Sequence, residues 1–384
     1  MTQSTIPTQT PPEHTCRGCG ATRLVRVLDL GPQPGSDVFP RADDPTPDAR
    51  WPLELWLCHA CALVQLGAIT PRLPAPPLAV ESATSRAHAR TSVAALLGEG
   101  PAAGARTVVE FASHHGGSWL GDLGAAGVRP AVDDEPADLV VDVHALAHEP
   151  DVDAALGRRA ERLAAGGLLV LEFHHLLALV QGGQFDTVRH GHWSYLSLTA
   201  VARLGSRYGL RVVGAQVVPV FGGSLRVLLA HETSSREPAG SVAAVLAAEG
   251  AAGLADPGAL GRLQGLARNT AAELRAWLEE QREAGRSVLG YGAPSKAPVL
   301  LGVSGVGPEL LPFTVDAAAA KHGRRLPGCG IPIRSVEALR TARPELVLVL
   351  TWDIAQEVMG QLEDGGGWGA RYVLPLPRPH AVGC

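Results

Sequence analysis

Four cysteines near the N-terminus form two close pairs, Cys16 with Cys19 and Cys58 with Cys61, and each pair has C-x-x-C spacing. Two such pairs can direct four thiolates at one tetrahedral ion, whereas four buried cysteines without a metal would need no paired spacing. Four thiolates close the coordination shell, so the expected ion is a structural Zn²⁺ that takes no part in catalysis.

Histidine is the second residue type whose placement predicts chemistry. Pairs of histidine follow three predicted strands, and two more fall in the block that begins at Gln184. Because the carboxyl ends of parallel strands meet at one edge, we expect these side chains to converge on a crevice there. Such a cluster can perform acid–base chemistry or bind a divalent metal, and a hydrogen-bonded surface cluster is the alternative. The histidines are His114, His115, His144, His148, His174, His175, His190 and His192.

A sheet must position these histidines, and the hydrophobic pattern predicts one in the middle of the chain. Its first strand runs into the glycine turn His114-His-Gly-Gly117, which opens a helix as in nucleotide-binding α/β units. The expected strands are Thr107–Ser113, Asp138–Val143, Gly167–Phe173, Leu210–Val220 and Ser224–Ala230, and the expected helices are Ser85–Leu97 and Val152–Ala165.

A second α/β unit is predicted after a long amphipathic helix, Leu260–Gly285. It begins at Gly290-Tyr-Gly-Ala-Pro-Ser-Lys296. Backbone N–H groups and Lys296 could face a phosphate there, although a tight strand–helix turn explains the spacing equally well. Further strands are expected at Phe313–Asp316, Glu345–Leu350 and Tyr372–Leu376. We therefore predict an α/β protein with a disordered tail (1–15), a zinc-binding module (16–77), a central truncated Rossmann-like domain (78–235) and a C-terminal Rossmann-like domain (242–384).

Composition excludes two classes of partner. The chain has 384 residues, 33 basic and 38 acidic residues and a net charge of -5, without a basic tract. We therefore expect no nucleic-acid partner. No apolar run approaches the roughly 20 residues that span a bilayer, and the first fifteen residues lack the apolar core of a signal peptide. We expect no membrane association and a cytoplasmic location.

Three ordered blocks resemble a known family. They are the two cysteine pairs, Gln184-Phe-Asp-Thr-Val-Arg-His-Gly-His-Trp-Ser-Tyr-Leu-Ser-Leu198, and Gly290–Lys296 with Lys321–Gly328. Together they resemble the zinc-containing, S-adenosylmethionine-dependent C-methyltransferases that methylate nucleotide-linked deoxysugar ketones in antibiotic pathways. The resemblance implies a central cofactor domain, a C-terminal domain that helps hold the nucleotide sugar, and a histidine base at His192. Imidazole suits that task because its pKa lies near neutrality.

The site residues follow from this resemblance together with the strand positions. The acid–base and polar candidates are His192, His148, His144, His190 and Arg189. The cofactor-binding candidates are Glu110, His114, His115, Gly116 and Gly117, and the substrate-binding candidates are His175, Tyr195, Ser224, Arg226, Tyr291, Lys296 and Asp316.

The chain departs from the family pattern at the cofactor site. Arg189 and Gly191 stand where the family pattern has a tyrosine and a glutamate before the histidine base. In the cofactor loop this chain has His114 and His115, which the family pattern lacks. Only 24 residues, 114 to 137, separate the first strand from the next clear one. A complete βαβ unit takes about 30 or more, so the strand that carries the ribose-binding carboxylate has no obvious place. The loop acids 133–135 could substitute for it.

We therefore predict an enzyme of specialised metabolism that has lost conventional S-adenosylmethionine binding. His192 would act as a base and His148 as a second acid–base group. The reaction would be proton transfer or rearrangement of a small pathway intermediate, which could be a nucleotide-linked sugar. One alternative retains S-adenosylmethionine and methylates a nucleotide-linked keto-deoxysugar. The other is a non-catalytic homologue that binds a partner or an intermediate.

Overall fold

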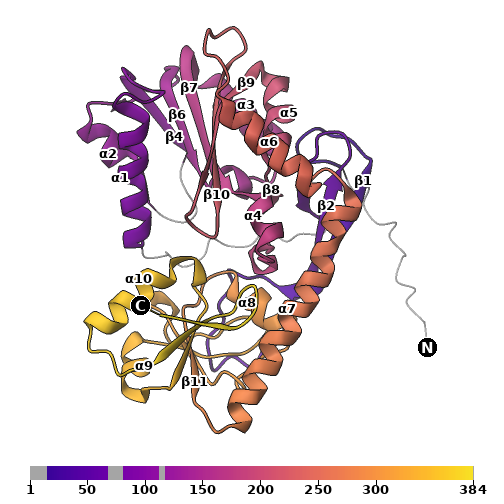
Figure 1. Cartoon of the computed structure of the whole chain (residues 1–384), viewed down its shortest axis with the longest axis vertical. Helices are drawn as coiled ribbons and strands as arrows, with labels where there is room; N and C mark the ends of the chain where they lie inside the picture. Colours follow the sequence, from indigo (N-terminus) through magenta and orange to yellow (C-terminus); the bar gives the residue numbers. More distant parts are fainter. Residues whose placement is uncertain (1–14, 68–80, 112–116, 384) are drawn as a thin grey trace, which may run out of the picture.

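The computed structural model describes residues 15–67, 81–111 and 117–383, which form three sheets with helices around them (Figure 1). The predicted mixed α/β architecture is confirmed. Three parts of the sequence predictions lie outside the described residues: the tail up to residue 14, the boundary at Pro71–Pro77, and the loop candidates His114, His115 and Gly116.

The N-terminal module is a four-stranded antiparallel sheet in the order β1-β2-β3-β8. Alternate residues of β2, such as Leu53, Leu55 and Leu57, are fully buried, which is the pattern of a strand with one face on a core. The fourth strand comes from the histidine-containing block far along the chain. Its residues Ser194 and Tyr195 pair with Gln65 and Val64. The strands are β1 (Leu24–Pro34), β2 (Arg50–Cys58), β3 (Val64–Leu66) and β8 (Ser194–Tyr195).

The central sheet has six strands in the order β5-β4-β6-β7-β10-β9, of which the first four are parallel. Its middle strands are hydrophobic on both faces because α1 and α2 pack on one side and α3 and α5 on the other. The strands are β4 (Thr107–Phe111), β5 (Arg129–Pro130), β6 (Ala137–Val143), β7 (Leu163–His174), β9 (Leu210–Val218) and β10 (Ser224–His231). The helices are α1 (Ala83–Leu97), α2 (Leu120–Ala125), α3 (Val152–Glu161), α4 (Leu176–Gln181) and α5 (Leu198–Gly205).

Two details of this sheet differ from the sequence predictions. Helix α3 ends at Glu161 rather than Ala165, because Leu163 already pairs with Ala137 and begins β7. The short segment after β4 does contain a second strand, the two-residue β5, which pairs with Thr107 and Val108. From β5 the chain enters β6 through a loop, and residues 131–136 contain no second crossover helix.

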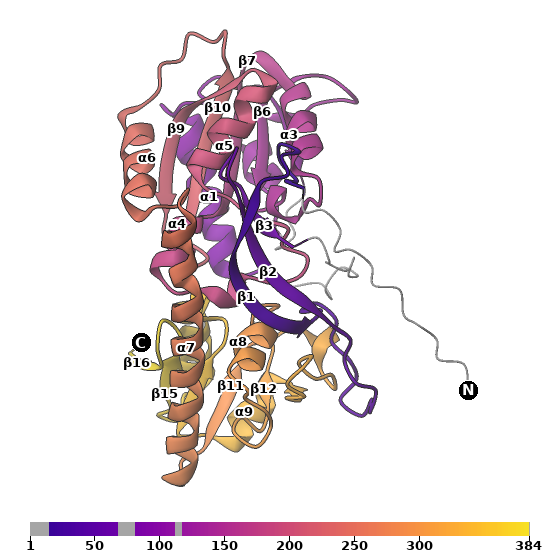
Figure 2. The same ribbon diagram turned by 90° about the vertical axis from the view of Figure 1, so that its right-hand side faces the viewer.

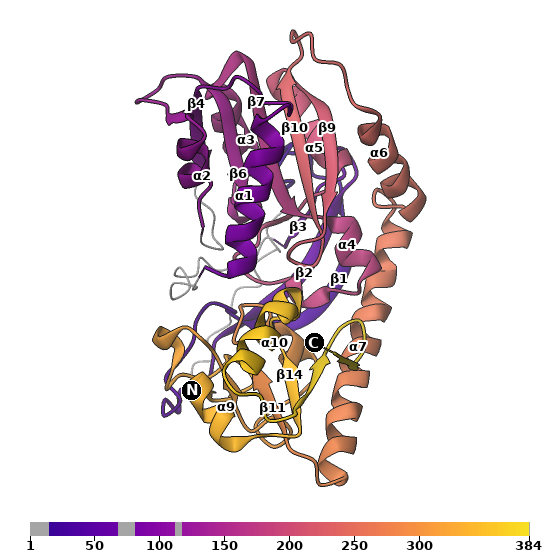
Figure 3. The ribbon, with the colours of Figure 1, turned by 60° about the vertical axis from the view of Figure 1, so that its left-hand side comes forward.

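The C-terminal lobe is a second six-stranded sheet in the order β13-β12-β11-β14-β15-β16, with only β16 antiparallel. Its strands are β11 (Val288–Tyr291), β12 (Thr314–Val315), β13 (Ile333–Arg334), β14 (Leu346–Val349), β15 (Arg371–Leu374) and β16 (His380–Val382). Its helices are α8 (Ala297–Val303), α9 (Val336–Ala342) and α10 (Ala355–Asp364). The helices α6 (Gly240–Ala252) and α7 (Pro257–Glu283) lead into it from the central sheet (Figure 3).

The N-terminal module joins the two lobes. The long β1–β2 ribbon extends from the central lobe to the C-terminal lobe, beside α7 and α8 (Figure 2). One hydrophobic core contains Leu30 of β1, Leu55 of β2, Leu274 of α7 and Leu300 of α8. The lobes are therefore fixed to each other along one side. No helix in the described ranges is long and apolar enough to cross a bilayer.

Candidate functional site

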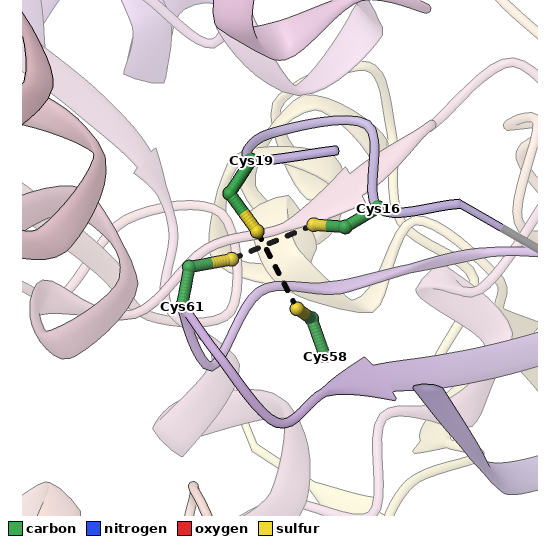
Figure 4. A group of neighbouring side chains, drawn as sticks. All are labelled: Cys16, Cys19, Cys58 and Cys61. Atoms are coloured by element: carbon green, nitrogen blue, oxygen red, sulfur yellow. Dashed lines mark hydrogen bonds between the residues drawn. The ribbon is translucent and has the colours of Figure 1, made fainter. Parts of the chain in front are cut away.

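The four cysteines of the N-terminal module converge on one point (Figure 4). All four sulfur atoms lie within 4.8 Å of one another. The Sγ atoms of Cys16 and Cys61 are 3.5 Å apart, and those of Cys19 and Cys58 are 3.6 Å apart. Ligands on a tetrahedral zinc ion with bonds of about 2.3 Å lie roughly 3.8 Å from each other, so this geometry fits Zn²⁺.

The pKa values of these thiols also favour a bound cation. The hydrogen bond from Cys61 lowers the pKa of Cys16 to about 5, and the same contact raises the pKa of Cys61. A second thiolate beside the first is therefore unfavourable until a positive ion is bound between them. With four sulfur ligands no position is open to substrate, so the zinc would contribute structure only.

A cleft of about 800 Å³ separates the central lobe from the C-terminal lobe. Imidazoles that follow β6 and precede β8 form one wall, and the loops after β11, β12 and β14 form the other. Seven of the predicted site residues line it. They are His144, His148, Arg189, His192, Tyr291, Lys296 and Asp316.

His148 and His192 lie next to each other in the wall of the cleft. Their ring centroids are 5.1 Å apart, and the rings are nearly perpendicular at 83°. Nδ1 of His148 donates to the carbonyl oxygen of Gly191 over 2.8 Å, so Nε2 is the nitrogen that accepts a proton when the ring is neutral. Two adjacent imidazoles of this kind can take and return a proton.

Tyr195 supports the loop that carries His192. Its ring lies 4.8 Å from the His192 ring, and its hydroxyl accepts a hydrogen bond from the Arg189 backbone N–H at 3.0 Å and donates to the Thr187 carbonyl. The side chain is fully buried and does not line the cleft. The structure therefore gives Tyr195 a place behind the site, whereas the sequence analysis placed it in contact with substrate.

Arg17, in the turn between Cys16 and Cys19 that we call the first cysteine knuckle, contacts a residue close to each histidine of the pair. The Arg17 guanidinium lies 4.5 Å from the ring centre of Trp193, which follows His192. It also donates to the carbonyl oxygen of Pro150 at 3.2 Å, two residues after His148. Because Arg17 lies between Cys16 and Cys19, an ordered knuckle holds this wall of the cleft in place.

Asp37, which the sequence analysis did not single out, joins all three parts of the chain. One carboxylate oxygen accepts a hydrogen bond from Arg189 Nη1 at 3.1 Å, and the other accepts one from the Ser295 hydroxyl of the C-terminal lobe. Asp37 belongs to the loop after β1 and lines the cleft. Nothing in its sequence neighbourhood signals this role, because both partners lie more than 150 residues away.

The wall formed by the C-terminal lobe carries charges that already have partners. Lys296 Nζ lies 2.5 Å from Asp353 Oδ1 and 3.8 Å from the centre of the Trp352 ring. Lys321 bonds to Asp316 at 3.2 Å. Helix α8, which follows Lys296, has only seven residues. The expected phosphate-facing lysine is thus neutralised by Asp353 in the structure.

Two predicted histidines lie away from the cleft. His175 turns toward α6, where Nε2 is 2.7 Å from the buried carboxylate of Glu249, because the chain bends into α4 directly after β7. His190 is buried between the carbonyl oxygens of Pro34 and Pro52 in the N-terminal module. The expectation that all the histidines share one crevice is therefore wrong for these two.

A buried ion network on β7, β10 and α1 fills the part of the central sheet where the sequence predicted the cofactor site, which we call the cofactor edge. Arg226 Nε donates to Glu172 at 2.9 Å, and His88 Nε2 lies 2.5 Å from the same carboxylate. Burial alone would raise the pKa of Glu172, but His88 and Arg226 outweigh it and lower the pKa. Ser224, on the same strand as Arg226, bonds to the Val220 carbonyl. Neither Arg226 nor Ser224 lines the cleft, contrary to the sequence expectation.

A small cavity lies at this edge and shares Glu81, Ser85, His144 and Phe221 with the wall of the cleft. The cavity between β4, β6 and α1 measures about 20 Å³. That is room for roughly one water, whereas ligand pockets measure about 300–1,000 Å³. Glu110 is occupied by the Ser118 hydroxyl and by the Trp119 backbone N–H, and the Trp119 side chain is buried beside it. Gly117 lines the same small cavity.

The loop acids 133–135 lie away from the cleft and the small cavity. Glu135 forms a surface ion pair with Arg129 at 2.8 Å, which lowers its pKa to about 2, and neither Asp133 nor Asp134 lines the cleft or the small cavity. These acids therefore do not supply the ribose-binding carboxylate that the sequence suggested, whereas the Glu81 carboxylate lines both cavities. Across the described ranges, only the four cysteines come close enough together to hold a metal ion, and the histidines do not.

Comparison with known proteins agrees with the architecture. Residues 219–377 match the "C-methyltransferase C-terminal domain", and residues 16–72 match the "Putative zinc binding domain". C-methyltransferase NovU from Streptomyces niveus is 29% identical over 408 aligned positions, which cover 97% of each chain. The chain is thus similar to C-methyltransferases along nearly its whole length.

Similarity of the chain to solved structures is weaker. Mitomycin 7-O-methyltransferase MmcR is 20% identical over 38% of this chain and 54% of its own, with a TM-score of 0.29. Magnesium protoporphyrin IX methyltransferase ChlM from Synechocystis PCC 6803, with bound SAH, is 10% identical over 40% of this chain and 90% of its own, with a TM-score of 0.28. At these scores neither structure bears on the function.

Proposed function

We propose that this protein, which is similar to C-methyltransferases, catalyses proton transfer on a carbon next to a carbonyl group, without S-adenosylmethionine, as a step in specialised metabolism. The observation that carries the proposal is the contrast between the open cleft, with His148 and His192 in its wall, and the closed cofactor edge. The substrate is a small intermediate, and a nucleotide-linked keto sugar is the class that the family favours.

The reaction needs no co-reactant. His192 takes a proton from the carbon beside the carbonyl, the C–H electrons form a C=C bond, and the carbonyl π electrons move to oxygen as an enolate. Arg189, held by Asp37, lies in the same wall and can stabilise that negative oxygen. Return of a proton from His192 or His148 to either face of the carbon, or rearrangement through the enolate, completes the cycle with atoms and charge conserved.

Methyl transfer remains the second candidate because the similarity to a C-methyltransferase extends over 97% of the chain. In that case the same base, His192, would generate the carbanion, and S-adenosylmethionine would supply the methyl group when bound. The ion network around Glu172 and the buried Trp119 speak against this candidate.

Deuterium exchange tests the base that both candidates share, and an assay for methylated product with and without S-adenosylmethionine distinguishes them. A nucleotide-linked 4-keto-6-deoxyhexose is incubated with zinc-loaded protein in D₂O, and the proton signals beside the ketone are followed by NMR. We expect exchange without S-adenosylmethionine and a loss of about 100-fold or more in His192→Ala. His231→Ala is the control, because His231 lies at the far end of β10 and bonds to Leu163. Methylated product that forms only with S-adenosylmethionine would overturn the proposal.

A further inference from the structure

Another imidazole in the cleft, His174, does not belong to the His148–His192 pair. It ends β7, and its Nε2 lies 2.7 Å from Gln184 Oε1. The Gln184 amide nitrogen donates to the Gly222 carbonyl oxygen at 2.8 Å. A carbonyl can only accept, so the amide nitrogen must face Gly222 and the amide oxygen must face His174. His174 Nε2 therefore carries the hydrogen, and Nδ1 carries the lone pair.

The surroundings keep His174 neutral. Desolvation in the wall of the cleft lowers its pKa to about 4, and the charges of His144 and Lys296 act in the same direction. A neutral imidazole with a fixed tautomer is a weak base at pH 7, but it is a permanent hydrogen-bond acceptor. His174 is thus suited to hold a donor group rather than to take its proton.

The opposite lobe completes the surroundings of His174. Lys296 Nζ lies 3.8 Å from the centre of the Trp352 ring, which packs against Gly222 beside Gln184 and His174. His174, Lys296 and Asp353 all line the cleft. Since Lys296 is paired with Asp353 at 2.5 Å, this corner carries no net positive charge. A phosphate would meet a carboxylate and a neutral acceptor there. A hydroxyl group can donate to His174 or Asp353 and accept from Lys296.

Close packing fixes this corner. The backbone of Gly222 has a φ of +82°, and a Cβ built there would lie 2.6 Å from the Trp352 ring. The same glycine supplies the carbonyl that orients Gln184. The chain from Gly222 through Gln184 to His174 is therefore held between the two lobes.

We propose that His174, Lys296 and Asp353 form a subsite that binds the hydroxylated ring of the substrate rather than its phosphates, and that Gln184 is the positioning residue that sets the tautomer of His174. The inference rests on the proposed function for its sugar-like substrate. It adds which end of such a substrate this corner takes.

Calorimetric titration with dTDP-glucose and with dTDP tests the subsite. If the corner binds hydroxyl groups, zinc-loaded protein should bind dTDP-glucose about tenfold more tightly than dTDP, and His174→Phe should bind the two equally. The affinity for dTDP should stay within about twofold in His174→Phe and in the control His231→Asn. Equal binding of the two ligands by the unaltered protein, an unchanged ratio in His174→Phe, or no binding of either ligand would overturn the subsite. The deuterium exchange described above decides the proposed function separately.

NMR of ¹⁵N-labelled histidine tests the positioning role without a ligand. We expect His174 to show the neutral ring with its hydrogen on Nε2 between pH 5 and 8, and Gln184→Leu to lose that single tautomer while the fold is retained. A protonated His174 at pH 6, or a hydrogen on Nδ1, would contradict the assignment.

Discussion

The two cavities at the carboxyl edge of the central sheet differ in size and in contents. Around the small cavity, Glu172, Arg226 and His88 satisfy one another out of contact with water. The large cleft is lined by imidazoles, and its Lys296–Asp353 pair is partly exposed. Under the proposed function, the first region belongs to the core and the second holds the reacting groups.

Zinc removal should have the largest effect and should separate the two regions. Structural zinc sites contribute roughly 10–16 kcal/mol of binding free energy in isolated fingers, so we expect Cys58→Ser or chelation to destabilise the chain by more than about 5 kcal/mol. The wall that carries His192 should respond first, because β3 pairs with β8 and Arg17 packs on Trp193. Metal analysis with denaturant unfolding gives the stability, and histidine NMR gives the order of events. Intact His192 signals in zinc-free protein would contradict the expected coupling.

Glu172→Gln tests whether the closed edge belongs to the core. The substitution leaves Arg226 buried without its counter-ion, and we expect a loss of about 3–5 kcal/mol in the free energy of unfolding.

The matched change in the cleft is Asp353→Asn, which removes the partner of the partly exposed Lys296. It should cost about 1–2 kcal/mol, less than Glu172→Gln, because the side chains of Lys296 and Asp353 are 11% and 20% exposed and Lys296 keeps its contact with the Trp352 ring. Similar losses for Glu172→Gln and Asp353→Asn in denaturant titrations would show that the two regions do not differ in this way.

Asp186 makes the joint between the lobes sensitive to pH. Its carboxylate accepts a hydrogen bond from Trp352 Nε1 at 2.8 Å, and burial raises its pKa to about 6. The folded chain therefore keeps a proton that the unfolded chain releases near pH 4, so stability falls as the pH rises from about 4 to about 6. Asp186→Asn should remove this slope and raise stability above pH 6 by roughly 1–3 kcal/mol. An unchanged slope in thermal unfolding across this range would refute the assignment.

The smallest effect is expected at a contact across the mouth of the cleft. Glu357 of α10 accepts hydrogen bonds from the backbone N–H groups of Ala83 and Thr84 at the start of α1. Burial alone would raise the pKa of Glu357, but these hydrogen bonds outweigh burial and lower the pKa. The stability that the hydrogen bonds give is therefore present at pH values above the ordinary pKa of a glutamate and is lost as the pH falls. Glu357→Gln should cost about 1 kcal/mol at pH 7 and little at pH 3. Equal losses at both values would rule out the charge as the cause.

The sequence predicted what depends on local periodicity and spacing. The buried strands β6 and β7 were recognisable as apolar runs, and the cysteine pairs indicated the metal centre that the structure assembles. The two-residue strands β5 and β8 were not recognisable, because such short segments become strands only through their partners. The domain boundaries stay predictions.

The site was predictable in part for a related reason. The positions of the predicted strand ends indicated that His144 and His148 lie at the cleft, because the carboxyl ends of parallel strands meet at one edge of a sheet. They did not show that His175 would turn toward Glu249, since the direction of a side chain after a strand depends on the following turn. Asp37 and Asp353 gave no signal, because their roles arise only when distant segments pack together.

Titration of the zinc-loaded protein with S-adenosylhomocysteine tests the closed cofactor edge most directly. The buried Glu172 network and the 20 Å³ cavity predict no binding heat at micromolar or submillimolar concentrations of the ligand. Micromolar binding that perturbs Trp119 fluorescence would contradict the account and would restore methyl transfer as the function.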